Sequence, residues 1–207
     1  MGQTLFFSAR EEPVSLTLIT PPAAAPVTLA EAKAHLNVTG DADDALITRL
    51  IAAATARFDG RDGLCGPLIE QTWQAQFDGF PRGRLELPLP PVSAVTAVTY
   101  RDAAGATQTL AADQYDVYGL DVLDGAYVLP ATAWPATDLR PEAVAVTFTA
   151  GYGAAADTVP EPIRQAILAT VATLYGQRED AYLGQAQLIT VPAVALDLIA
   201  SHRPWSF

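Results

Sequence analysis

The chain has 207 residues, of which 50% are hydrophobic and 17% are charged, and this composition excludes wholesale disorder. Twelve basic against 23 acidic residues give a formal net charge of −11, which argues against a protein that grips nucleic acid by neutralising phosphates. The single cysteine, Cys65, excludes an internal disulfide, and no apolar run approaches the ~20 residues of a membrane span. The opening MGQTLFFSAR lacks the long apolar region of a signal peptide, so we expect synthesis in the cytoplasm.

Residues 1–26 are expected to form an extended N-terminal segment. Within it, VSLTLIT (residues 14–20) alternates enough to predict one strand. The stretch PPAAAP that follows predicts an extended linker, because each proline fixes its own φ and keeps the preceding residue out of the helical region.

A first helix is predicted to begin at Thr28, where TLAE has the spacing of a capping box. The Thr28 hydroxyl can accept a backbone N–H of the first turn, while the Glu31 carboxylate reaches back to the Thr28 N–H. Residues 37–40, NVTG, are expected to end this helix.

A second, longer helix is predicted from DADDALITRLIAAATARFDG, with Asp41 or Asp43 as its cap and Gly60 and Gly63 at its end. One apolar stripe at helical spacing is expected to pack on a neighbouring element. Its members include Leu46, Leu50 and Arg57.

From about residue 68 the period changes to two, and many short strands are predicted up to residue 150. LIEQTWQAQF alternates as a half-buried antiparallel strand, and AVAVTFTAGYG is the strongest strand pattern of the chain. Asp124-Gly125 is the expected turn of a hairpin. This spacing of strands favours a small sandwich or barrel.

Helical periodicity returns at VPEPIRQAILATVATLYGQRED, whose prolines suit a first helical turn. Three of its apolar residues are spaced to pack on another helix: Ile163, Ile167 and Leu174. A last short helix is predicted to begin near Pro192 and to stop before Pro204.

Strands enclosed by helices predict an α+β fold in which a small antiparallel β domain is inserted into a helical one. The expected domains are the extended segment 1–26, a helical core made of 27–67 and 151–191, the inserted β domain 68–150, and a C-terminal helix and tail at 192–207.

The residues offer no credible active site, metal site or cofactor site. DADDALITRL lacks the glycine and the closing glutamate of a calcium loop, and GYG at residues 151–153 lacks the lysine of a phosphate loop, so we expect a tight exit turn there. His35 and His202 have no nucleophile elbow nearby, and Cys65 is interpreted as a small buried hydrophobe. The prediction is therefore a protein that is not an enzyme.

The C-terminal SHRPWSF is a candidate interaction segment. Trp, Arg and other aromatic side chains are the usual anchors of protein interfaces, and this tail is too short to build a core of its own. The alternative, left open by the sequence, is that the tail folds back over its own helices. The side chains concerned are His202, Arg203, Trp205 and Phe207.

Taken in order, several stretches resemble the head–tail connector (adaptor) proteins of tailed bacteriophages, prophages and phage-derived gene transfer agents. No one stretch is specific, and the similarity rests on their order over roughly residues 14–204. The stretches are PVTLAEAKAHLNV, DDALITRLIAAATARFDGRDG, QTW, LELPLPPVSAVTAVTYRDAAG, FTAGYG and VPEPIRQAILATVATLYGQRED.

This resemblance implies a virion structural protein that forms a ring, commonly twelvefold, in the particle neck. It implies contacts with the portal protein and with a stopper or tail-completion protein, and passage of DNA through the lumen without specific binding. The expected portal interface comprises Leu196, Leu198, Ile199, His202, Arg203, Trp205 and Phe207. The expected subunit–subunit interface comprises Leu46, Leu50, Arg57, Ile163, Ile167 and Leu174.

Two other functions remain as alternatives to this one. An enzyme with an unfamiliar site would need converging titratable groups, and the scarcity of His and Cys speaks against it. A monomeric β module that binds carbohydrate or peptide would cluster exposed aromatic side chains on the β block. The aromatic residues here are spread along the sequence, which disfavours that module.

Overall fold

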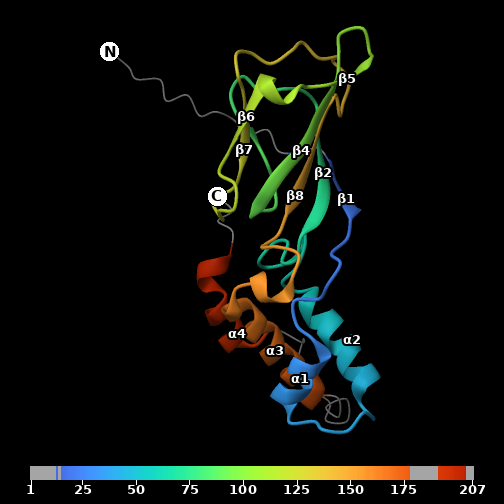
Figure 1. Ribbon diagram of the computed structural model, residues 1–207, viewed down its shortest axis with the longest axis vertical. Coiled ribbons are helices and arrows are strands. Elements are labelled where there is room, and N and C mark those ends of the chain that lie inside the picture. Colours follow the sequence, from blue (N-terminus) through green and yellow to red (C-terminus); the bar gives the residue numbers. More distant parts are fainter. Residues whose placement is uncertain (1–12, 14, 178–190, 204–207) are drawn as a thin grey trace, which may run out of the picture. The chain divides into compact units, whose positions relative to one another are not determined.

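The computed structural model describes residues 13, 15–177 and 191–203. The chain divides into two compact units, a β unit of residues 1–20 and 72–149 and a helical unit of residues 21–71 and 150–207. Helices and antiparallel strands thus occupy separate parts of the chain, and the predicted α+β class is confirmed (Figure 1).

The helical unit is built around its longest helix, α3 (Glu161–Gly176). Helices α1 (Leu29–Leu36), α2 (Asp44–Thr55) and α4 (Ala193–Leu198) pack against α3, and short 3-10 turns lie at Ala156–Thr158 and Ala200–His202. Its core is made of buried aliphatic side chains from all four helices together with residues of the connecting loops. The largest fully buried members are Ile47, Phe58, Leu68, Ile69, Ile163, Ile167 and Ile199.

Helix α1 begins as its sequence predicts. The Thr28 Oγ1 accepts the Glu31 N–H at 3.3 Å, and the Thr28 N–H donates to the Glu31 carboxylate at 2.8 Å. The helix ends at Asn37, which has a φ of 56°, a left-handed conformation that asparagine tolerates. The capping box therefore sets the start of the helix from purely local chemistry.

Helix α2 begins at the predicted position but ends earlier than predicted. Asp43 occupies the N-cap without a side-chain capping bond, because its carboxylate accepts the Tyr175 hydroxyl instead. The helix ends at Thr55, not at Gly60. Beyond Thr55 the chain turns so that Phe58 is fully buried, and the Asp59 carboxylate accepts a hydrogen bond from the Leu68 N–H.

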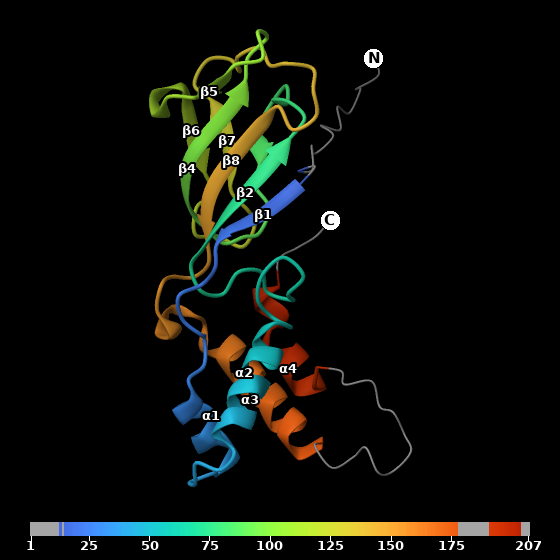
Figure 2. The same ribbon diagram turned by 90° about the vertical axis from the view of Figure 1, so that its right-hand side faces the viewer.

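The β unit contains two sheets. The five-stranded sheet has the order β1-β2-β8-β4-β5, and the three-stranded sheet has the order β3-β7-β6. Figure 2 shows β6 and β7 behind the larger sheet. The strands are β1 (Ser15–Thr20), β2 (Gln71–Phe77), β3 (Leu85–Glu86), β4 (Val92–Arg101), β5 (Thr107–Thr109), β6 (Tyr115–Tyr118), β7 (Tyr127–Pro130) and β8 (Val144–Ala150), with a 3-10 turn at Ala112–Gln114.

The period-two patterns give the predicted inward faces. In β2, Trp73, Ala75 and Phe77 are buried while the residues between them are partly exposed. In β8, Val146 and Phe148 have no exposed surface. These alternating side chains form the core of the β unit because successive residues of a strand point to opposite faces.

Strands β6 and β7 form the predicted antiparallel hairpin, but residues 119–126 connect them, a longer loop than a two-residue turn. Gly119 makes the return possible: it has a φ of +70°, and a Cβ atom there would lie 2.5 Å from the Gly125 carbonyl oxygen. The loop thus closes through backbone contact that only glycine allows.

Candidate assembly surfaces

Helix α2 exposes a face of mostly small side chains. Its inward residues Ile47, Ile51 and Ala54 are buried at helical spacing, so the opposite side of the helix faces solvent. That exposed face consists of Ala45, Thr48, Arg49, Ala52, Ala53 and, just past the helix end, Ala56. A helix surface of this kind lets a neighbouring helix approach closely.

Two of the six residues predicted for the subunit–subunit interface are fully buried in the helical unit, and the other four are half-buried. Ile163 and Ile167 have no exposed surface and are core residues of α3. Leu50 and Leu174 are half-buried against the same core, and Leu46 and Arg57 are also half-buried. Ile163 and Ile167 therefore belong to the core of their own subunit and cannot offer their side chains to a neighbour.

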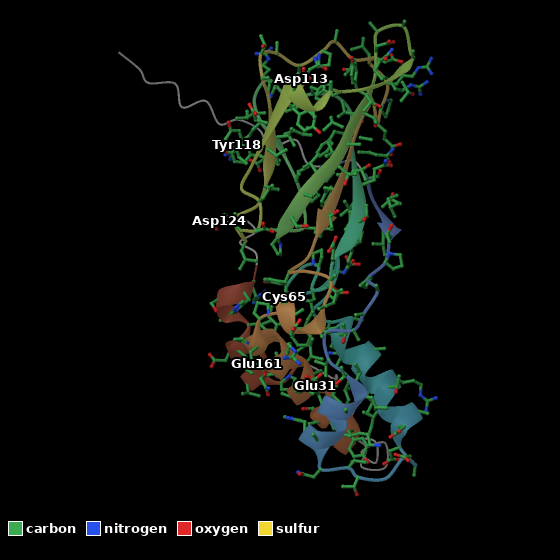
Figure 3. All side chains as sticks on the ribbon, in the orientation of Figure 1. Glu31, Cys65, Asp113, Tyr118, Asp124 and Glu161 are labelled. Carbon is green, nitrogen blue, oxygen red and sulfur yellow. The ribbon has the colours of Figure 1, made fainter. Side chains whose placement is uncertain are left out.

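Arg164 joins the start of α1 to α3. Its guanidinium donates to the Pro26 carbonyl at 3.2 Å and to the Glu161 carboxylate at 2.8 Å, and it also pairs with Glu31. Figure 3 shows Glu31 and Glu161 on these helices. The backbone and hydroxyl bonds from Thr28, together with Arg164, lower the pKa of Glu31. A single arginine therefore holds the linker, α1 and α3 together.

A second polar cluster fixes the turn between α1 and α2. Lys33 pairs with Asp41 at 2.9 Å and with Asp44 at 2.6 Å, and Tyr175 of α3 donates to Asp43. The bonds to Asp44 and Asp41 raise the pKa of Lys33. The acidic turn that could be mistaken for a calcium loop is thus a local ion-pair cluster.

Asp59 organises the loop that follows α2. Its Oδ1 accepts the Leu68 N–H at 2.7 Å and the Gln71 side-chain amide at 2.8 Å. Burial raises the pKa of this carboxyl, although the hydrogen bonds oppose that shift. Gln71, the polar exception on the inward face of its strand pattern, is buried because Asp59 satisfies its amide.

Burial and close backbone contacts account for Cys65 and for the GYG turn at residues 151–153. Cys65 is buried, as its sequence context predicts, and burial raises the pKa of its thiol to about 12. Gly151, with a φ of +127°, lies so close to Ile69 that a Cβ atom would meet its backbone at 2.7 Å. Backbone bonds from Tyr152 to Leu68 and from Glu70 to Gly153 complete this tight turn.

The C-terminal helix α4 has an anchored side and an open side. Ala195 and Ile199 have no exposed surface and pack in the core of the helical unit. Val194 and Leu196, in contrast, are 58% and 41% exposed. The prediction of Ile199 as a portal contact therefore has to be corrected, because its side chain is enclosed by its own subunit.

The remaining predicted portal residues divide differently. Leu198 is half-buried against the core and His202 is half-buried, whereas Arg203 is exposed. Trp205 and Phe207 lie outside the described residues. Of the described part of this segment, Leu198 and His202 thus pack partly on their own subunit, and Arg203 does not.

The β unit brings together aromatic side chains that sequence spacing did not connect. The rings of Phe80 and Trp134 stack with centroids 4.4 Å apart, and Tyr100 lies 5.7 Å from Phe80. Tyr118 and Tyr127 stack at 5.5 Å across the β6–β7 hairpin. Aromatic residues that are spread along the sequence thus lie side by side in the β unit. Of these five, Tyr118 alone is exposed, and the other four are half-buried.

Within residues 13, 15–177 and 191–203, no three His, Cys, Asp or Glu side chains gather where they could hold a metal ion. Over the same residues no helix combines the length and apolar character needed to cross a membrane.

Comparison with known proteins finds one matching family model and several similar structures. Residues 26–72 match the family model described as phage gp6-like head–tail connector protein, a segment that spans α1, α2 and the loop held by Asp59. The whole structure is similar to a chain in the neck of an empty gene transfer agent particle with C6 symmetry, with a TM-score of 0.72 and 26% identity over 93% of this chain and 97% of that one. The match over residues 26–72 and this structural similarity support a head–tail connector family.

Two further solved structures are similar to this chain. A chain in the virion of a native gene transfer agent particle matches it with a TM-score of 0.71 and 27% identity, over 93% of this chain and 96% of that one. A chain in the neck of a native particle with C12 symmetry, at a TM-score of 0.66 and 24% identity over 93% and 97%, shares the fold. No curated protein matches this sequence.

Proposed function

We propose that the connector is a structural subunit of a ring in the neck of a phage or phage-like particle, such as a gene transfer agent. The observation that carries this proposal is the similarity, over 93% of the chain, to a chain from a gene transfer agent neck with C6 symmetry. In this proposal the ring, a dodecamer, lies between the portal protein and the stopper or tail-completion protein, and its work involves no catalysis.

The exposed face of α2 is the surface we assign to contacts between ring subunits. A ring requires a heterologous contact, in which two different patches of each subunit meet. Ala45, Ala52 and Ala53 present little side-chain volume and lose little conformational entropy when a neighbour covers them. Leu46, Leu50 and Arg57, which are half-buried, border this face and are proposed to contribute at its rim.

The open side of α4 is the surface we assign to the portal. Leu196 and Val194 present apolar groups, and Arg203 adds a cation beyond the helix. Ala195 and Ile199 hold the helix from within, so the exposed side chains are displayed on a fixed backbone. Trp205 and Phe207 remain proposed anchors at the end of this segment.

The charge of the connector fits a channel that DNA crosses without adhering. A formal charge of −11 on each subunit gives a ring a strongly negative potential, which opposes binding to phosphate. DNA is therefore proposed to pass through the lumen without specific contacts.

The test is electron microscopy of the purified connector, alone and with its cognate portal, on two matched variants. Ala52→Trp adds bulk to the exposed α2 face, while Ala103→Trp adds the same bulk to an exposed turn of the β unit. We expect the wild type and Ala103→Trp to form rings on the portal and Ala52→Trp to remain folded but unassembled. A wild-type chain that forms no ring with its portal would overturn the proposed function, and an assembling Ala52→Trp would remove only the α2 contact.

A further inference from the structure

Residues 113–124 form an exposed margin of the three-stranded sheet, which we name the β6 margin. It comprises β6, the last strand of that sheet, and most of the loop that returns to β7. Tyr118, Leu120 and Val122 on this margin are 47%, 36% and 44% exposed. Among the described residues, eight large apolar side chains are exposed, and three of them lie within residues 118–122. Exposed apolar surface is therefore concentrated on this margin.

Next to this margin, one face of the sheet carries an ordered row of side chains. Tyr118 is the register partner of Tyr127, and Tyr127 is the register partner of Glu86 on β3. The tyrosine rings stack at 5.5 Å, and the Arg84 guanidinium lies 5.0 Å from the Tyr127 ring centroid while it pairs with Glu86 at 2.7 Å. The row is thus fixed before any partner arrives, which lowers the entropy cost of binding.

The loop of the margin is also held in place. The Asp121 N–H donates to the Val92 carbonyl at 2.8 Å, and the close approach of Gly119 to Gly125 closes its base. Leu120 and Val122 are therefore displayed by a backbone that has long-range contacts. An exposed apolar loop with a fixed backbone, next to the end strand of a sheet, is typical of a surface that binds a partner.

The charge on the margin has one sign. Residues 113–124 contain Asp113, Asp116, Asp121 and Asp124 and no Lys, Arg or His. Figure 3 shows Asp113, Tyr118 and Asp124 following one another along the same side of the β unit. The nearest cation of the row, Arg84, is already paired with Glu86. A partner that covers the tyrosines and the loop must therefore place its charges against carboxylates.

We propose that the β6 margin binds an extended, basic segment of a partner protein, which pairs with the outer edge of β6. Side chains alternate along a strand, so Asp116 and Tyr118, two residues apart, share the exposed face of β6. On that face such a segment can pair Lys or Arg with Asp116 and lay the apolar stems of the same side chains on Tyr118, while its charges are also attracted to Asp124 on the adjoining loop. A second copy that pairs through the same margin is disfavoured as occupant, because it would bring the four Asp side chains of both margins together with no cation among them. This proposal does not depend on ring formation.

The test measures the binding of labelled peptides to the full-length connector by fluorescence anisotropy. The probes are capped peptides of roughly eight residues, long enough to cover a typical strand, that alternate Val or Thr with Lys or, as the comparison, with Glu. The variants are Tyr118→Ser and the pair Asp116→Lys with Asp124→Lys. Leu139→Ser, at a fully exposed leucine of the same unit, and Asp157→Lys, in the helical unit, are the matched controls.

We expect the lysine peptide to bind, with an affinity that decreases as salt increases, and the glutamate peptide not to bind. Each margin variant is expected to weaken binding by about tenfold or more, as truncation of an interface anchor does, while both controls bind like the wild type. Equal binding of the two peptides, or equal losses in margin and control variants, overturns the proposal. Circular dichroism confirms folding, and if Tyr118→Ser unfolds, the surface Asp variants still decide the outcome. Dimerisation through the margin, measured by sedimentation, also overturns it.

Discussion

Two substitutions on α4 separate its core side from its proposed portal side. Ile199 has no exposed surface, whereas Leu196 is 41% exposed, three residues away in the sequence. Ile199→Ala should therefore destabilise the helical unit, while Leu196→Ala should leave stability nearly unchanged and weaken attachment to the portal. The pair distinguishes a residue that positions the helix from one that contacts a partner.

The expected magnitude follows from burial. Truncating a core Ile to Ala costs about 2–5 kcal/mol, and α4 has only six residues and can detach without unfolding α3. The measured loss cannot exceed the free energy of docking α4, so we expect the lower part of that range, about 2–3 kcal/mol. For a chain of this size that lowers the Tm by roughly 5–10 °C. Leu196→Ala should change the unfolding free energy by less than about 0.5 kcal/mol.

Thermal unfolding followed by circular dichroism at the helical minimum is the appropriate assay, because every α-helix among the described residues belongs to the helical unit. Portal attachment is measured in parallel by co-sedimentation with the purified portal. The reasoning fails if the two variants lose equal stability, or if Leu196→Ala attaches to the portal as well as the wild type does.

Two further predictions concern carboxylates of the helical unit. Because the folded-state pKa of Glu31 is lowered, its contribution to stability is present above the ordinary value of 4.5 and lost as the pH falls through the folded value. Denaturant unfolding at a series of pH values should therefore show a steeper acid loss for the wild type than for Glu31→Gln, and parallel curves would contradict this. Asp59→Ala leaves the donors of Leu68 and Gln71 without their acceptor and should cost about 1–3 kcal/mol at neutral pH. Asp59→Asn keeps an acceptor and removes a charge whose burial is unfavourable, so its unfolding free energy should be well above that of the Ala variant; equal losses would show that the acceptor is irrelevant.

Local patterns in the sequence predicted much of the fold. The capping box at Thr28 involves atoms only three residues apart, so the start of α1 follows from short-range hydrogen bonding. Alternation identified the inward faces of β2 and β8, because a strand turns successive side chains to opposite sides whatever its neighbours are. The resemblance to head–tail connectors likewise came from the order of such local stretches.

What only the tertiary structure decided is which surfaces are covered. Helical spacing shows that Ile163 and Ile167 lie on one apolar stripe of α3, and it predicts Ile199 on the apolar side of α4. It cannot say whether these sides meet the same subunit or another one. The end of α2 at Thr55 depends on Asp59 reaching Leu68, a contact absent from any local pattern. Long-range packing determines which faces of the helices and strands are buried, because burial and strand register depend on residues distant in the chain.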